Sequence, residues 1–142
     1  MFNDSDDSPE LVVIIQCDDV VKRCSGFFCM NDFYERTGKF AGYPENTRYM
    51  TMTCGGCCGN LLTAKIENLG RRLERAKLQK SDVVIHFASC VCSDNSHRQP
   101  CPFMGRMRNL LERKGFGKII LGSHVSQKAE AKRKSGIYKN WE

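Results

Sequence analysis

Four short apolar segments, separated in part by helical patterns, constrain the fold of this 142-residue chain more than any other feature. They are LVVIIQ (11–16), RYMTMT (48–53), DVVIHFAS (82–89) and KIILGS (118–123). Three of them are near-continuous runs of Val, Ile and Leu, which is typical of parallel strands covered on both faces. The segment 48–53 alternates instead, so we expect it at an edge of the sheet.

The segments between these strands carry the spacing of helices. In residues 60–78 apolar side chains recur along one helical face, with charged residues between them. Residues 103–114 form a second helical pattern, with Pro102 suited to its start and Gly115 to its end. A short helix is expected over 27–36. The order predicts an α/β domain over 11–124: a small four-stranded parallel sheet in a flavodoxin-like three-layer sandwich, with right-handed crossovers.

Each predicted strand is followed by a cysteine or a histidine, namely Cys17, Cys54, Cys90 and His124. The carboxyl ends of parallel strands share one edge of the sheet, where open α/β sheets place their ligands. Adjacent strands are about 4.8 Å apart, so thiols at this edge can converge. The remaining cysteines are expected in the loops that leave the same edge; they are Cys24, Cys29, Cys57, Cys58, Cys92 and Cys101.

The stretch TCGGCCG, from Thr53 to Gly59, is the densest cluster of thiols. Cys54 and Cys57 have the CxxC spacing that lets two thiolates reach one metal ion. Gly55 and Gly56 permit a tight turn between them. The helix that follows offers free amides and a positive end, which favour thiolates. The sequence therefore predicts a thiolate-rich metal centre at the carboxyl edge.

A thiol-dependent enzyme is the alternative that the residues leave open. Residues 17–23, CDDVVKR, have the C-x5-R spacing of the phosphate loop of cysteine-dependent phosphatases, with Cys17 as nucleophile and Arg23 holding the oxyanion. Asp18 and Asp19 would repel a phosphate there. A reductase would instead need a resolving thiol, which Cys57 or Cys58 could supply. Neither activity accounts for the thiols on the other loops.

The composition indicates the cellular compartment in which these thiols are expected and the chemistry that they serve. The acidic start (1–10) and the short apolar run after it show no secretory signal or membrane span, so a cytoplasmic protein without stable disulfides is expected. The nine cysteines then point to metal or redox chemistry. The net charge of +6 includes a basic tail over 125–142, which could contact nucleic acid or an acidic partner.

Taken together, these motifs resemble the CGGC domain family from about residue 11 to residue 124. The resemblance rests on CDDVVKRCSGFFC, TCGGCCG, VIHFASC, QPCP and GSH. Members are described as metal-binding proteins without an assigned reaction, with zinc suggested by their cysteines and histidines. The resemblance implies that the site includes Cys17, Cys24, Cys29, Cys54, Cys57, His86, Cys90, Cys101 and His124.

His86 precedes Cys90 by four residues, which span about 13 Å in an extended strand. We therefore expect His86 in the core or in contact with a metal ligand, and not as a ligand itself. Cys58 and Cys92 have no counterpart in the family pattern and are expected to be extra thiols. Zinc requires four ligands of the Cys and His type, whereas the excess of thiols suits an iron–sulfur cluster. The candidate histidines and the family description favour zinc by a small margin. A zinc site would suggest metal handling, and a cluster would suggest sensing or electron transfer.

Overall fold

A computed structural model describes residues 9–92, 101–124 and 127–137 of the chain. Its sheet has four parallel strands in the order β2-β1-β3-β4: β2 (Arg48–Thr53), β1 (Leu11–Gln16), β3 (Val83–Phe87) and β4 (Ile119–Leu121). The helices are α1 (Phe27–Glu35), α2 (Leu62–Arg75), α3 (Ser89–Cys92), α4 (Met104–Arg113) and α5 (Gln127–Lys134). The predicted α/β fold with an all-parallel sheet is confirmed, and it is consistent with a flavodoxin-like sandwich.

The strands lie where their side chains predict. Every residue of β1 is buried, as expected for a central strand covered on both faces. It pairs with β2 from Leu11 beside Arg48 to Gln16 beside Thr53, and with β3 from Leu11 beside Val83 to Ile15 beside Phe87. The alternating segment β2 forms an edge of the sheet, as its pattern predicts.

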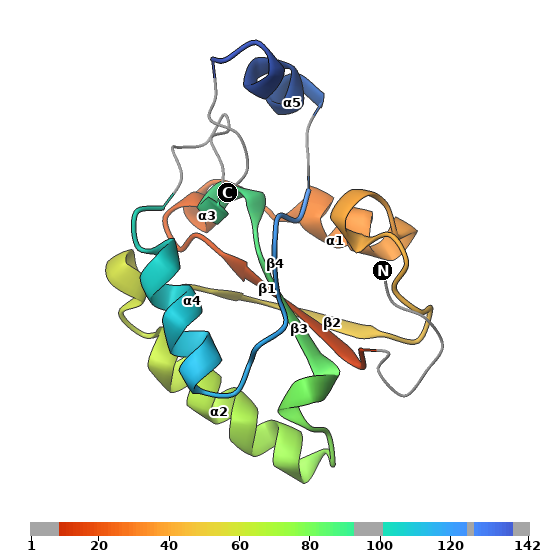
Figure 1. The fold of residues 1–142 in the computed structure, drawn as a ribbon, viewed down its shortest axis with the longest axis vertical. Coiled ribbons are helices and arrows are strands. Elements are labelled where there is room, and N and C mark those ends of the chain that lie inside the picture. Colours follow the sequence, from red (N-terminus) through yellow and green to blue (C-terminus); the bar gives the residue numbers. More distant parts are fainter. Residues whose placement is uncertain (1–8, 93–100, 125–126, 138–142) are drawn as a thin grey trace.

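Helices cover both faces of the sheet, which gives three layers (Figure 1). On one face Val12 and Ile14 of β1 pack with Phe33 of α1. On the other face Val13 and Ile15 pack with α2 and α4, which bury side chains at helical spacing; these are Leu62, Ile66, Leu69 and Leu73 of α2 and Met104, Met107 and Leu111 of α4. Alternate residues of one strand therefore serve two separate cores.

Four elements differ from the sequence prediction, namely β3, β4, α3 and α5. The strand expected over 82–89 ends at Phe87, and β4 is confined to Ile119–Leu121 within the expected 118–123. After β3 the backbone turns at Ala88, whose carbonyl accepts the N–H groups of Val91 (2.8 Å) and Cys92 (3.2 Å) and so forms α3. Within the basic tail, Gln127–Lys134 forms α5.

Most of the acidic segment 1–10 and part of the tail lie outside the described residues. No helix in the described ranges has the length and apolar character that crossing a membrane requires.

Candidate functional site

The cysteines gather at the carboxyl edge of the sheet, although not all of them lie in loops. Cys17 follows β1 and Cys54 follows β2. Cys92, which was expected in a loop, lies in α3 together with Cys90. Cys29 was also assigned to the loop after β1, but it lies in the first turn of α1, within the helix expected over 27–36. α3 begins directly after the turn at Ala88, and α1 begins after the loop that follows β1, so Cys29, Cys90 and Cys92 lie in helices that begin at this edge.

Four cysteines from three separate segments line one hollow at this edge, which we call the rim hollow. Its volume is about 220 Å³. Its lining includes Cys17 after β1, Cys54 and Cys57 from the glycine turn, and Cys101 before α4. Cys17 and Cys54 are buried, whereas Cys57 is exposed. Phe103 and Met107 contribute an apolar wall.

Backbone hydrogen bonds hold the buried part of the rim hollow. Cys54 N–H donates to the carbonyl of Gln16 (3.0 Å), and Cys101 N–H donates to the carbonyl of Val91 (2.7 Å). Two of the sulfur atoms also accept N–H groups: Asp18 N–H lies 3.4 Å from Cys54 Sγ, and Phe103 N–H lies 3.4 Å from Cys101 Sγ. Such donors stabilise a charged sulfur and tune metal–thiolate centres.

The charges beside the rim hollow favour a cation over a phosphate. Asp18 and Asp19 line it together with Lys22. Arg23, the arginine of the C-x5-R motif, directs its guanidinium to Asp19, with Nη1 at 3.4 Å from Oδ2. The residue that would hold the oxyanion in a phosphatase is therefore paired with a carboxylate, and two acids stand where a dianion would bind.

The turn between Cys54 and Cys57 depends on Gly55. Its φ is +78°, and a Cβ at this position would lie 2.6 Å from Leu61 Cβ. Gly38 has a φ of +56° but open space around its Cβ position, so it is a control for backbone strain alone. We expect Gly55→Ala to lower the free energy of unfolding by about 2 kcal/mol more than Gly38→Ala, because the extra methyl group is also overpacked. Urea denaturation measures both; equal losses would contradict the close packing of this turn.

A second group of thiols lies around Cys90. Its sulfur accepts the N–H of Cys17 at 3.4 Å. The pKa of Cys90 is raised to about 12, chiefly by burial and also by the nearby thiols of Cys29, Cys17 and Cys24, against the lowering effect of the Cys17 N–H. Cys90 packs against the cores of both faces of the sheet, so this group lies between the rim hollow and α1.

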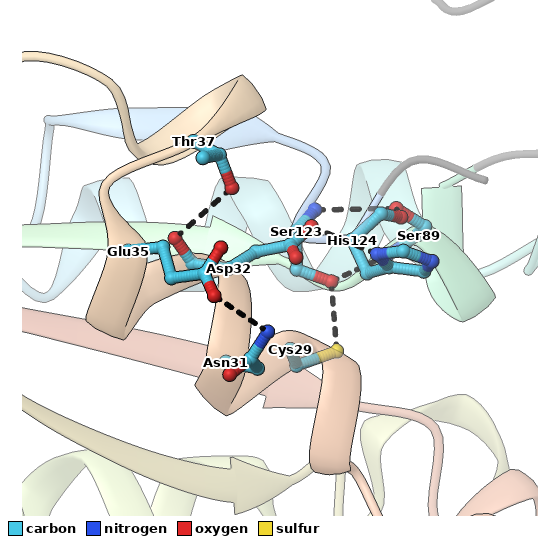
Figure 2. Close-up of polar contacts among 8 residues, drawn as sticks. All are labelled: Cys29, Asn31, Asp32, Glu35, Thr37, Ser89, Ser123 and His124. Atoms are coloured by element: carbon cyan, nitrogen blue, oxygen red, sulfur yellow. Dashed lines mark hydrogen bonds and ion pairs between the residues drawn. The ribbon is translucent and has the colours of Figure 1, made fainter. Parts of the chain in front are cut away.

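His124 lies beside α1 rather than in the lining of the rim hollow. Its Nδ1 is 2.8 Å from Asp32 Oδ2, and its ring stacks on Phe28 with centroids 4.7 Å apart. The residue before it, Ser123, has its Oγ 3.1 Å from Cys29 Sγ. Figure 2 shows Cys29 and Asp32 of α1 beside Ser123 and His124, which follow β4, and Ser89 of α3.

His86 is a buried residue of the α1 face. Tyr43 O–H and the His86 Nε2 atom are 2.6 Å apart, and His86 Nδ1 is 2.8 Å from the carbonyl of Gly122. Because a carbonyl can only accept, Nδ1 carries the proton and Nε2 accepts from Tyr43. Burial lowers the pKa of His86 to about 4 and raises that of Tyr43. The carbonyl that His86 contacts belongs to Gly122, two residues before His124.

Of the two extra thiols, Cys58 and Cys92, the structure describes the side chain of Cys92 alone. Cys92 is buried, and its S–H donates to the carbonyl of Phe87 at 3.5 Å, so it is part of the core on the α2 and α4 side. The side chain of Cys58 lies outside the described part of the structure. His97 lies within residues 93–100, which are also outside it.

The donor atoms at the carboxyl edge suit a metal that prefers sulfur. Zinc and iron–sulfur centres both use cysteine thiolates drawn from separate segments. Among the described residues, however, no three His, Cys, Asp or Glu side chains are already grouped so that they could hold one ion. The cysteine sulfur atoms are of the right chemical type for zinc or an iron–sulfur centre, and they would have to move closer together when the metal binds.

Four side chains that contact Cys29, His124 or their neighbours beside α1 were not predicted from the sequence. They are Phe28, Asp32, Ser89 and Ser123. For Asp32 a signal was present: it follows Cys29 by three residues within a predicted helix, and this spacing puts both on one face. For Ser89 and Ser123 the contacts depend on the pairing of β3 with β4.

Comparison with known proteins agrees with the motifs. A family profile described as the CGGC domain matches residues 11–124, which is most of the chain. The curated proteins and the solved structures give no match. The extent of the profile match shows that the chain belongs to the CGGC domain family.

Proposed function

We propose that this protein binds a metal ion through thiolates of the rim hollow, with Cys17, Cys54, Cys57 and Cys101 as ligands. One observation carries the proposal: four cysteines from three segments line a single hollow at the edge where parallel α/β sheets bind ligands. Their number matches the four ligands of a tetrahedral zinc site. Membership of a cysteine-rich family described as metal-binding supports the same conclusion.

The surroundings of the hollow support a bound cation. Asp18 and Asp19 place negative charge beside the sulfur atoms, and the N–H groups of Asp18 and Phe103 donate to two of them. Thiolates are the form of cysteine that binds metal, so groups that stabilise charged sulfur favour binding. The apolar wall of Phe103 and Met107 limits access of water to that side.

Zinc is the first candidate metal. A set of four cysteines satisfies zinc completely, and such closed sites are structural or serve metal handling. An iron–sulfur cluster has the same ligand preference and would serve electron transfer or sensing. The sequence also marks four other residues as candidate ligands, namely Cys24, Cys29, Cys90 and His124. They lie toward α1 and are not among the four ligands proposed here.

Metal analysis of the purified chain tests the proposal. Protein prepared without oxygen should contain about one zinc ion per chain and be colourless, as a four-cysteine site predicts. Iron together with acid-labile sulfide and broad visible absorption would indicate an iron–sulfur cluster instead of zinc. A folded chain that contains neither metal, and that takes up neither when supplied under reducing conditions, would refute thiolate metal binding altogether.

A further inference from the structure

The edge strand β2 has one side on which no strand pairs in the described part of the chain (Figure 1). It bonds to β1 through every second residue: Arg48 and Cys54 donate their N–H groups to carbonyls within residues 10–16, both at 3.0 Å. The odd-numbered residues of β2 therefore direct their backbone N–H and C=O groups away from β1; they are Tyr49, Thr51 and Thr53. Such a row of backbone groups is able to pair with one further strand.

A groove of about 510 Å³ lies between β2 and α2. Its apolar lining consists of Met50 and Met52 of β2 and Ala64 and Leu69 of α2. Both methionines are partly buried and pack against the core on this face of the sheet. Methionine side chains adapt their shape to what they contact, and they are common on surfaces that bind peptides. Because side chains alternate along a strand, every second side chain of a strand added to β2 would face this groove.

The charged side chains that line the groove are all positive. They are Lys65 and Arg72 of α2, and no Asp or Glu of the described residues lines it. Lys65 Nζ donates to Thr53 Oγ1 at 3.0 Å, so it lies beside the carboxyl end of β2. Glu67 of α2 lies away from the groove and pairs with Lys114 at 2.8 Å. The groove therefore favours a ligand with negative charge.

The same features argue against two other occupants. A second copy of this chain that paired through β2 would bring two basic grooves together on one sheet, and like charges disfavour such an interface. Nucleic acid would be attracted by the charges, but its backbone has phosphates in place of the N–H and C=O groups with which a strand edge pairs. An extended peptide has both backbone groups, and acidic side chains give it the complementary charge.

We propose that β2 and this groove bind an extended acidic segment of a partner protein as an added strand. Main-chain hydrogen bonds to the odd-numbered residues of β2 hold the segment. On the α2 side, an apolar side chain of the segment lies against the two methionines, and carboxylates on either side of it reach Lys65 and Arg72. The groove and the rim hollow have no lining residue in common, so binding here does not require the metal centre.

Fluorescence anisotropy with a labelled, end-blocked peptide of seven residues tests the proposal on the full chain. In this acidic peptide, glutamates at the second and sixth positions flank a central leucine, and the other positions are threonine. We expect it to bind at least about tenfold more tightly than the same peptide with lysine in place of both glutamates. Equal affinities, or no binding of the acidic peptide at about 1 mM, would overturn the proposal.

N-methylated peptides separate strand pairing from charge attraction. Two versions of the acidic peptide have N-methyl groups at alternate residues, one at the odd and one at the even positions. Only one of them should bind, because a strand pairs with its neighbour through the N–H groups of every second residue. Attraction by charge alone would give both peptides the same affinity, and that result would refute an added strand.

Variants of the protein locate the site. Arg72→Glu should weaken binding of the acidic peptide about tenfold. Arg71→Glu is the matched control, since Arg71 lies near Glu67, away from the groove. Thr51→Pro removes an outward N–H group without removing a bond to β1 and should abolish binding, whereas Thr51→Val should retain it. Circular dichroism confirms that each variant is folded. Equal weakening by Arg71→Glu and Arg72→Glu would refute the groove as the site.

The two other occupants are tested with the same variants. Sedimentation velocity would reveal a dimer that Arg72→Glu alters and Arg71→Glu does not, which would make a second copy the occupant. A labelled single strand of oligothymidylate that binds the natural chain, and that Arg72→Glu releases while Arg71→Glu does not, would make nucleic acid the occupant. Either result would overturn the acidic peptide as the ligand, and we expect neither.

Discussion

Lowering the pH from 7 to 4 should destabilise this protein by about 3 kcal/mol through His86 alone. His86 is fully buried and neutral, and burial lowers its pKa from 6.5 to about 4. Below pH 6.5 the unfolded chain takes up a proton that the folded chain refuses, so the contribution of His86 to stability is complete above pH 6.5. It is lost as the pH falls toward 4, where the folded state also protonates.

Urea denaturation at closely spaced pH values measures this effect. His86→Gln removes the titrating group and keeps an amide for hydrogen bonds to Tyr43 and Gly122. The slope of stability against pH between 6.5 and 4 should therefore be flatter in the variant than in the natural sequence. A His86→Gln protein with an unchanged slope would show that another group causes the acid sensitivity.

Replacement of Cys54 or Cys57 by serine should lower the bound metal from about one per chain to a small fraction, because a zinc site needs all four ligands. Stability should fall with it, since binding to the native state alone contributes to the free energy of unfolding. The Cys57 variant is the sharper of the two. Cys57 is exposed, so loss of its thiol costs little packing, and a large fall in stability would have to come through the metal.

Three comparisons control this experiment. Cys24→Ser removes a partly buried thiol outside the rim hollow, and Cys58→Ser removes the neighbour of Cys57; both should keep their metal. After chelation, the natural chain and Cys57→Ser should have the same thermal midpoint. Full metal loading in the Cys54 and Cys57 variants would contradict the CxxC pair as ligands. Loss of metal in Cys58→Ser would mean a different ligand set.

The parallel sheet and the edge that carries the thiols could be predicted from local patterns. The apolar runs that became β1 and β3 are covered on both faces, and their composition already requires this. Alternation in 48–53 predicted the edge position of β2. Because all strands of a parallel sheet end at the same side, the cysteine or histidine that follows each strand had to lie at the carboxyl edge.

The division of the thiols into two groups could not be predicted in the same way. It depends on which face each loop follows after its strand, and on where α3 and α4 begin. Cys29 was assigned both to the loop after the first strand and to the helix expected over 27–36, and it lies in the first turn of α1, which begins at Phe27. Cys92 looked like a further rim thiol and is buried in the core against Phe87.

The sequence by itself determined the strands, the parallel sheet and the side of the sheet at which sulfur accumulates, because these follow from residue patterns within single segments. Only the tertiary structure decided which side chains meet. Cys29 and Ser123 are 94 residues apart in the chain, and Asp32 and His124 are 92 apart. Such contacts arise from the strand order β2-β1-β3-β4 and the packing of α1 on one face, neither of which is encoded in the spacing of neighbouring residues.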